Sequence, residues 1–280
     1  MTEPKPKAAG VDKKAGLPPD IPPRDGADLQ NDLHWRYKKK TLSDHFAAAA
    51  IKGLRFVADT FFKNRHGHRA VVLETVAAVP GMVGSMHNHL LSLRRMKHDN
   101  GLVRTLMEEA ENERMHLMTF AEVAKPSVME RVMITATQVA FFGFFSMAYM
   151  FNKRAAHRFI GLLEEEAVQS YTHYLDAIDD GREENVDAPK IAKEYWKLGD
   201  DAKLRDVVVA VREDEAEHRD VNHACADKLE KVIAERKAEK AQIKAAKKSK
   251  AARIAKEAQD TLNAAEKFLP KTQPKRSAKP

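Results

Sequence analysis

The chain has 280 residues, a formal net charge of +7 and a single cysteine, Cys225. That length suits one large domain with tails. One cysteine excludes an internal disulfide and a cysteine-based zinc site, and it suits a reducing compartment. The excess positive charge lies mainly near the C-terminus, which is typical of contact with an anionic membrane or a nucleic acid. Since no nucleic-acid-binding motif accompanies it, we expect a membrane surface and no nucleic acid.

Composition divides the chain into three parts: a disordered tail at 1–33, a helical domain at 34–230 and a basic, low-complexity tail at 231–280. The first part holds prolines and acids without an apolar run, so it resembles neither a secretory signal nor a mitochondrial transit peptide. In the second part no β-strand alternation persists, and we predict an all-α fold. We expect helices at about 43–62, 69–96, 102–123, 127–151 and 153–178, a short helix within 182–200, and a sixth long helix after Gly199-Asp200.

The first helix mixes apolar Phe46, Leu54 and Phe61 with basic Lys52 and Arg55. This pattern predicts either an ordinary amphipathic helix on a core or a helix lying in a membrane interface.

No charged residue occurs from Met133 to Phe151, which is long enough for a transmembrane helix. We reject a span, because this stretch joins the helices that carry Glu113 and Glu164 and the chain offers no return segment. We expect a crossover helix that rests in the membrane without crossing it.

Two Glu-x-x-His motifs, Glu113 with His116 and Glu215 with His218, lie about a hundred residues apart. Residues three apart share one helical face, so each motif offers a carboxylate and an imidazole to one point. Glu74 and Glu164 add a carboxylate from each of two further helices, among apolar neighbours. The alternative is that these acids are exposed and the histidines incidental.

Such a set of four glutamates and two histidines is typical of ferritin-like di-iron and di-manganese bundles. Carboxylates with few imidazoles favour iron or manganese over zinc or copper(I). Four carboxylates also balance two divalent cations, whereas four buried carboxylates alone would be very costly. On the same helix as Glu113, we expect Glu108 and Glu109 to form a solvated face.

Four stretches then resemble, in the same order, the motifs of the alternative oxidases. They are Leu73-Glu74-Thr75 with Pro80-Gly81-Met82, Asn112 to Leu117, Leu163 to Ala167, and Asp214 to His223. The resemblance covers roughly residues 34–230. It implies a ferritin-like four-helix bundle with a di-iron centre and two membrane-interfacial helices. The implied enzyme is a cyanide-insensitive, homodimeric, monotopic membrane oxidase that oxidises two ubiquinols and reduces O₂ to water without pumping protons.

The resemblance also implies a role for individual residues. The six residues above become ligands of two iron ions, and Tyr171 becomes the radical-forming tyrosine. Asn112, Tyr195, Trp196 and Asp214 would support the ligands. The expected ubiquinol site comprises Arg55, Asp59, Arg69, Leu73, Leu163, Glu166, Ala167 and Ser170, and the expected dimer interface includes His89, Leu90, Arg94 and His157.

The N-terminus lacks a regulatory cysteine and a transit peptide, which favours the cytoplasmic face of a bacterial inner membrane. The alternative is the matrix face of the mitochondrial inner membrane. Rival functions are a plastoquinol terminal oxidase, a quinone-linked di-iron hydroxylase, a ferritin-like iron-binding protein without enzymatic activity, and a helical scaffold without metal.

Overall fold

A computed structural model describes residues 33–62 and 65–266. The predicted N-terminal tail, except for its last residue, lies outside these ranges, as does the end of the predicted basic tail. Between the described termini the chain forms seven α-helices and one isolated β-bridge between Asp187 and Lys203. The prediction of an all-α fold is confirmed.

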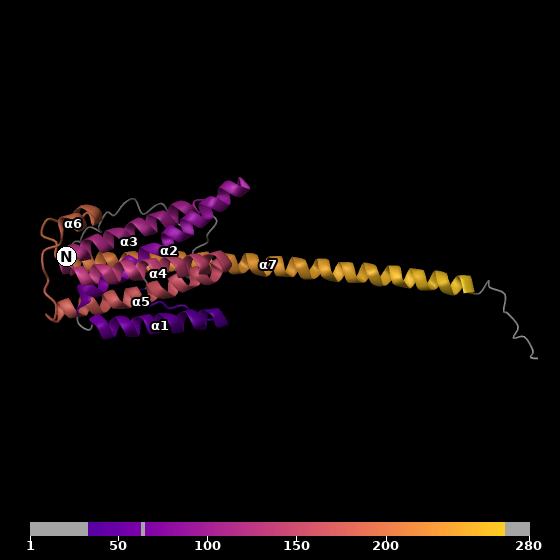
Figure 1. Cartoon of the computed structure of the whole chain (residues 1–280), viewed down its shortest axis with the longest axis horizontal. Helices are drawn as coiled ribbons and strands as arrows, with labels where there is room; N and C mark the ends of the chain where they lie inside the picture. The colour runs from indigo at the N-terminus through magenta and orange to yellow at the C-terminus, as the bar shows by residue number, and fades with distance from the viewer. Residues whose placement is uncertain (1–32, 63–64, 267–280) are drawn as a thin grey trace, which may run out of the picture. The chain divides into compact units, whose positions relative to one another are not determined.

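The helices follow the predicted segments closely. They are α1 (Leu42–Phe62), α2 (His66–Arg95), α3 (Leu102–Ala124), α4 (Val128–Phe151), α5 (Lys153–Asp179), α6 (Lys190–Trp196) and α7 (Leu204–Glu266). Contacts divide the chain after Leu229 into two compact units, and α7 contributes residues to both. In the first unit, α1 to α5 run beside the beginning of α7 (Figure 1).

Local sequence signals set several helix ends. Ser127 and Glu130 form the predicted capping box at the start of α4, in which each side chain accepts a hydrogen bond from the other residue's backbone N–H. Asn100 and Gly101 have φ angles of 57° and 89°, and this left-handed pair makes the predicted turn between α2 and α3.

Close helix packing surrounds the centre of the bundle. Gly161 on α5 faces the imidazole of His223 on α7, and a Cβ atom there would lie 2.7 Å from the ring. The missing side chain therefore lets α5 and α7 approach each other. Next to it, Arg158 donates a 2.7 Å hydrogen bond to Nδ1 of His223.

Helix α4 is a crossover, as predicted. It connects α3 to α5. The hydroxyl of its Tyr149 forms hydrogen bonds with Asn88 of α2 and His157 of α5, so α4 packs against both of these helices. Two helices are long and apolar enough to cross a membrane, but 67% of the apolar stretch of α2 is buried, against 11% for α4.

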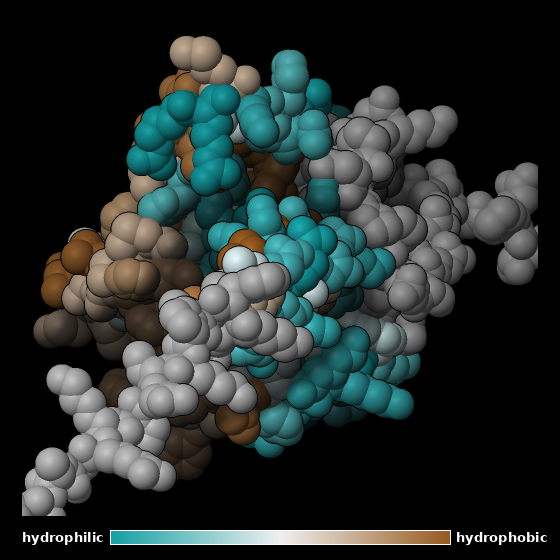
Figure 2. Space-filling model, turned by 90° about the vertical axis from the view of Figure 1, so that its right-hand side faces the viewer, coloured by the Kyte–Doolittle hydropathy of each residue, from teal (hydrophilic) through white to brown (hydrophobic). Residues whose placement is uncertain are grey.

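Apolar side chains remain exposed on α1 and α4, and brown surface gathers on the left flank of Figure 2. In α1, Ile51 and Phe62 face the core, whereas Phe46, Leu54 and Phe61 do not. One side of α1 therefore packs on the core and the other side is exposed, and contact of the exposed side with a membrane stays a prediction. The exposed set includes Phe46, Leu54, Phe56, Val57, Phe61, Val132, Val139, Phe142, Phe144, Met147, Met150 and Phe151.

Candidate metal centre

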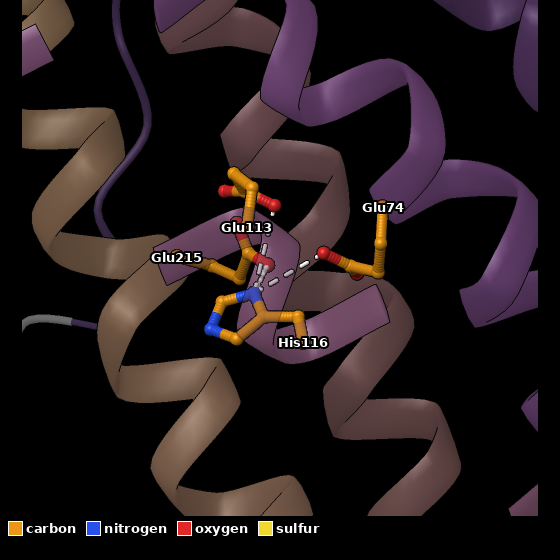
Figure 3. A group of neighbouring side chains, drawn as sticks. All are labelled: Glu74, Glu113, His116 and Glu215. Carbon is orange, nitrogen blue, oxygen red and sulfur yellow. Dashed lines mark hydrogen bonds and ion pairs between the residues drawn. The ribbon is translucent and has the colours of Figure 1, made fainter. Parts of the chain in front are cut away.

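Four side chains from three helices meet inside the bundle. Potential ligand atoms of Glu74 (α2), Glu113 and His116 (α3) and Glu215 (α7) all lie within 4.8 Å of one another. Figure 3 shows the three carboxylates around Nδ1 of His116. That nitrogen is 3.1 Å from Glu74 Oε2 and 3.2 Å from Glu215 Oε1.

The other two predicted ligands lie at the same centre. Nδ1 of His218 is 2.7 Å from Glu113 Oε1, so the second motif faces the first. Glu164 of α5 is fully buried and interacts with the Glu215 carboxyl group. All six residues are therefore brought together, and all six are buried. The alternative of exposed acids and incidental histidines does not describe this arrangement.

Helical spacing explains why each motif works as a pair. Glu113 and His116 come within 3.5 Å, and Glu215 and His218 within 3.8 Å, because residues three apart share a face.

Burial sets the charge state of this cluster. It raises the pKa of Glu74 and of Glu164 well above the ordinary range, and the neighbouring Glu215 and Glu113 raise both further. Burial lowers the pKa of His116, but the nearby carboxylates of Asp214, Glu113 and Glu215 outweigh this effect, and the pKa is raised. Cations that bind at the cluster would therefore displace protons from these carboxyl groups.

The donor set fits a hard metal cation. Both carboxylate oxygens of Glu113 and of Glu215 are buried and have no partner in hydrogen-bonding geometry among the described residues. Buried oxygens without partners are costly, and carboxylates with a minority of imidazoles suit iron or manganese.

A polar network holds the site from the α6 side. Asp214 Oδ2 lies 3.4 Å from Nε2 of His116 and accepts hydrogen bonds from Trp196 (2.8 Å) and Asn112 (2.9 Å). The Asn112 amide also donates to the hydroxyl of Tyr195 at 3.1 Å. The four residues predicted to support the ligands thus form one network that orients His116.

Tyr171 touches the cluster directly. Its buried hydroxyl donates a hydrogen bond to Oε1 of Glu74, and its ring stacks on Phe120 with centroids 5.5 Å apart. Burial raises the pKa of the phenol, with Glu74 and Glu215 adding to the effect, so the residue stays a neutral hydrogen-bond donor.

A cavity of about 250 Å³ reaches the cluster from α1 and α4. Apolar side chains make up most of its lining, and Glu74, Glu164 and Glu215 lie at its inner end. Six predicted ubiquinol-site residues line it: Arg55, Arg69, Leu73, Leu163, Glu166 and Ala167. Asp59 forms ion pairs with Arg69 and Arg55 beside it, whereas Ser170 is not among the lining residues.

Comparison with known proteins decides the family. The sequence model of the alternative oxidase family matches residues 26–227. The chain belongs to the alternative oxidase family. It is 53% identical over 201 residues to alternative oxidase 3, mitochondrial, of Glycine max, covering 72% of this chain and 62% of that relative. Ubiquinol oxidase 1c, mitochondrial, of Arabidopsis thaliana is 53% identical over 201 residues, 72% of this chain and 61% of its own length. The chain thus spans about three fifths of these relatives.

The predicted dimer residues of this family member lie in two environments. His89, Leu90 and Arg94 are exposed at the end of α2. His157 is buried within the chain, where Nδ1 is 2.9 Å from Asn222 Oδ1 and Nε2 is 3.0 Å from the Tyr149 hydroxyl. The interface itself stays a prediction.

The expectation of a solvated face at Glu109 is wrong, although Glu108 is exposed. Glu109 is only 5% exposed, and burial raises its pKa to about 7. It lies one turn before Glu113, and its partner Asn222 lies one turn after His218. Because residues four apart share a helical face, the sequence could have predicted that Glu109 and Asn222 lie on the same faces as the two motifs.

A directional hydrogen-bond chain leads to Glu109. Lys153 donates to Asn88 at 2.6 Å, Asn88 donates to the Tyr149 oxygen at 2.7 Å, and the Tyr149 hydroxyl contacts His157. The Asn222 amide oxygen only accepts, so Nδ1 of His157 carries the proton and Nε2 accepts from Tyr149. Each donor in this series of hydrogen bonds points toward Asn222, whose amide donates to the Glu109 carboxylate.

Proposed function

We propose that this chain is a ubiquinol:oxygen oxidoreductase that reduces O₂ to water without pumping protons and is resistant to cyanide. The observation that carries the proposal is the apolar cavity that joins the exposed faces of α1 and α4 to the carboxylates of the cluster. A lipid-soluble reductant needs such a path, and a storage protein or a scaffold does not. The names of the relatives, ubiquinol oxidase and alternative oxidase, support the same reaction.

Six residues would hold the metal: Glu74, Glu113, His116, Glu164, Glu215 and His218. Two iron ions at this site would supply the redox chemistry that passes electrons from quinol to O₂. Four carboxylates neutralise two divalent cations, so a loaded site carries no net charge inside the bundle. Asp214 keeps its place by accepting from Trp196 and Asn112, and it holds the His116 ring in one orientation.

The cavity would bind and orient the quinol. Arg69 forms an ion pair with Asp59 and lines the cavity. From there its guanidinium can donate a charge-assisted hydrogen bond to a quinol oxygen. Glu166, held by Arg55, offers a carboxylate that can accept a quinol proton. Two quinols release four electrons and four protons, which matches the conversion of one O₂ to two waters.

Tyr171 is proposed to donate one electron during O₂ reduction. Its phenol is hydrogen-bonded to Glu74, so the proton has an acceptor at hand when the electron leaves. Burial keeps the phenol away from bulk water.

The exposed apolar faces of α1 and α4 are proposed to rest in one leaflet of an inner membrane, with the protein monotopic and dimeric. The relatives' names all give mitochondria. The matrix face of the mitochondrial inner membrane is therefore closer to the comparisons than the bacterial location that we expected from the N-terminal composition.

Oxygen uptake by the purified, iron-loaded protein tests the proposal. We expect uptake with a short-chain ubiquinol in the presence of cyanide, and its loss in Glu215→Ala. Glu213→Ala, an exposed change two residues away, is the matched control. Faster uptake with plastoquinol would favour the plastoquinol oxidase, and iron loading beyond two ions per chain without uptake would favour iron storage.

A further inference from the structure

Residues 230–266 lie outside the stretch that matches the alternative oxidases, yet α7 continues through them as regular helix. Four large apolar side chains stay exposed along this part, Ile233 (54%), Ile243 (50%), Ile254 (53%) and Leu262 (60%). Exposed apolar residues that are scattered round a helix need no explanation. The placement of these four is not scattered.

At about 100° per residue, the four fall within a sector roughly 100° wide. Ile243 and Ile254, for example, are eleven residues apart, which is close to three full turns. Four cations share the sector and lie in pairs between Ile233, Ile243 and Ile254: Arg236, Lys240, Lys244 and Lys247. We call this sector the basic-apolar face.

Acidic residues avoid the basic-apolar face. Glu230, Glu235, Glu239, Glu257 and Asp260 all project from other sides of the helix. Between Lys240 and Lys256 the helix holds seven cations and no acid: Lys240, Lys244, Lys247, Lys248, Lys250, Arg253 and Lys256. The charge on the face is therefore not neutralised by neighbours on the same face.

We infer that the basic-apolar face of α7 binds the surface of an anionic lipid bilayer. Isoleucine and leucine would enter the boundary between headgroups and acyl chains, while lysine stems lie along the surface and their ammonium groups reach lipid phosphates. Anionic headgroups attract each such cation. Nucleic acid is the weaker partner, because phosphate binding needs cations and not a row of large apolar side chains among them.

A local probe on the full chain tests this contact. An environment-sensitive dye would be attached to cysteine at Ile254→Cys, on the face, or at Ala252→Cys, on the opposite side, each in a Cys225→Ala background. With vesicles containing phosphatidylglycerol, we expect a blue shift at position 254 and little change at 252. Vesicles of phosphatidylcholine alone should give no shift at either position.

Matched charge variants complete the test. Lys240→Gln, Lys244→Gln and Lys247→Gln together remove three cations from the face, and Lys231→Gln, Arg253→Gln and Lys256→Gln remove three from other sides. At low salt we expect the first set to weaken the dye response to anionic vesicles by roughly a hundredfold in lipid concentration, and the second set far less.

Equal weakening by both sets, equal shifts at 252 and 254, or a shift with duplex DNA but not with vesicles would overturn the inference. This lipid contact is independent of the oxidase activity, because the dye reports only on α7. Loss of O₂ uptake and loss of the dye response are therefore distinguishable failures.

Discussion

Asn222 donates hydrogen bonds to both carboxylate oxygens of Glu109, at 3.0 and 3.1 Å, inside the bundle. The same amide donates to the backbone oxygen of His218 at 3.0 Å. One side chain thus ties a buried acid on α3 to a predicted metal ligand on α7.

Removing that amide should destabilise the protein strongly. Asn222→Leu keeps the volume but leaves the Glu109 carboxylate buried without its donor, and we expect a loss of about 2–3 kcal/mol in the free energy of unfolding. Urea denaturation measures it. Adding Glu109→Gln should recover part of the loss, since an amide carries no charge. If the single variant is as stable as the parent, this contact contributes nothing to the fold.

His157 should make stability depend on pH. Burial lowers its pKa to about 4, so the folded state holds it neutral, while the unfolded chain takes up a proton near pH 6.5. Between these values the unfolded state binds more protons, so stability falls as pH drops, by up to about 3 kcal/mol between pH 7 and pH 4. Denaturation of the parent and of His157→Gln across this range isolates the effect. The stability difference between the two proteins should shift in favour of the variant at low pH, and a constant difference would contradict the prediction.

Metal loading should stabilise the fold and release protons. Glu74 and Glu164 have raised pKa values, so cations that bind there displace protons into the buffer. Anaerobic titration with ferrous iron should raise Tm, by the equivalent of about 2.7 kcal/mol per site at a hundredfold excess over Kd. The heat of binding should vary with the ionisation enthalpy of the buffer. His218→Ala should lose most of the gain in Tm, whereas His173→Ala, at an exposed position, should keep it.

Arg69 should control quinol affinity. Arg69→Gln removes a charge-assisted donor from the cavity wall, and we expect KM for ubiquinol to rise roughly tenfold to a hundredfold. Lys52→Gln removes an exposed cation of α1 that does not line the cavity, and it should leave KM unchanged. Steady-state O₂ uptake over a range of quinol concentrations gives both values, and an unaltered KM in Arg69→Gln would remove this residue from the binding site.

Tyr171→Phe should lower kcat and leave KM for quinol near that of the parent. The variant keeps the ring that stacks on Phe120 and loses only the hydroxyl that contacts Glu74. Rapid-freeze electron paramagnetic resonance should detect a tyrosyl signal in the parent during turnover and none in the variant. Normal turnover without a signal would exclude an electron-donating role.

Helical periodicity in the sequence predicted most of the helices and much of the candidate site. The two Glu-x-x-His pairs needed only a helix to bring each carboxylate beside its imidazole, and the capping box at Ser127 marked a helix start within the described chain. Which helices meet is a tertiary property. Glu108 and Glu109 are neighbours in the same acid-rich stretch, yet only Glu109 turns toward Asn222, and composition alone does not distinguish them.

Long-range pairs were equally hidden. The resemblance implied an interface role for His157, but its contacts with Tyr149 and Asn222 of its own chain depend on tertiary packing that the sequence does not reveal. The continuation of α7 to Glu266 was not predicted either, because a lysine- and alanine-rich segment with few large apolar residues gives a weak periodic signal.

The cavity between α1 and α4 has a kinetic consequence for the proposed enzyme. If the exposed apolar faces of α1 and α4 rest in the membrane as proposed, the quinol reaches the cavity by lateral diffusion within the lipid bilayer and not from bulk water. Saturation is then governed by the mole fraction of quinol among the lipids. Diluting the bilayer with inert lipid, at a fixed total amount of quinol, would slow the reaction although the concentration per volume of solution stays the same.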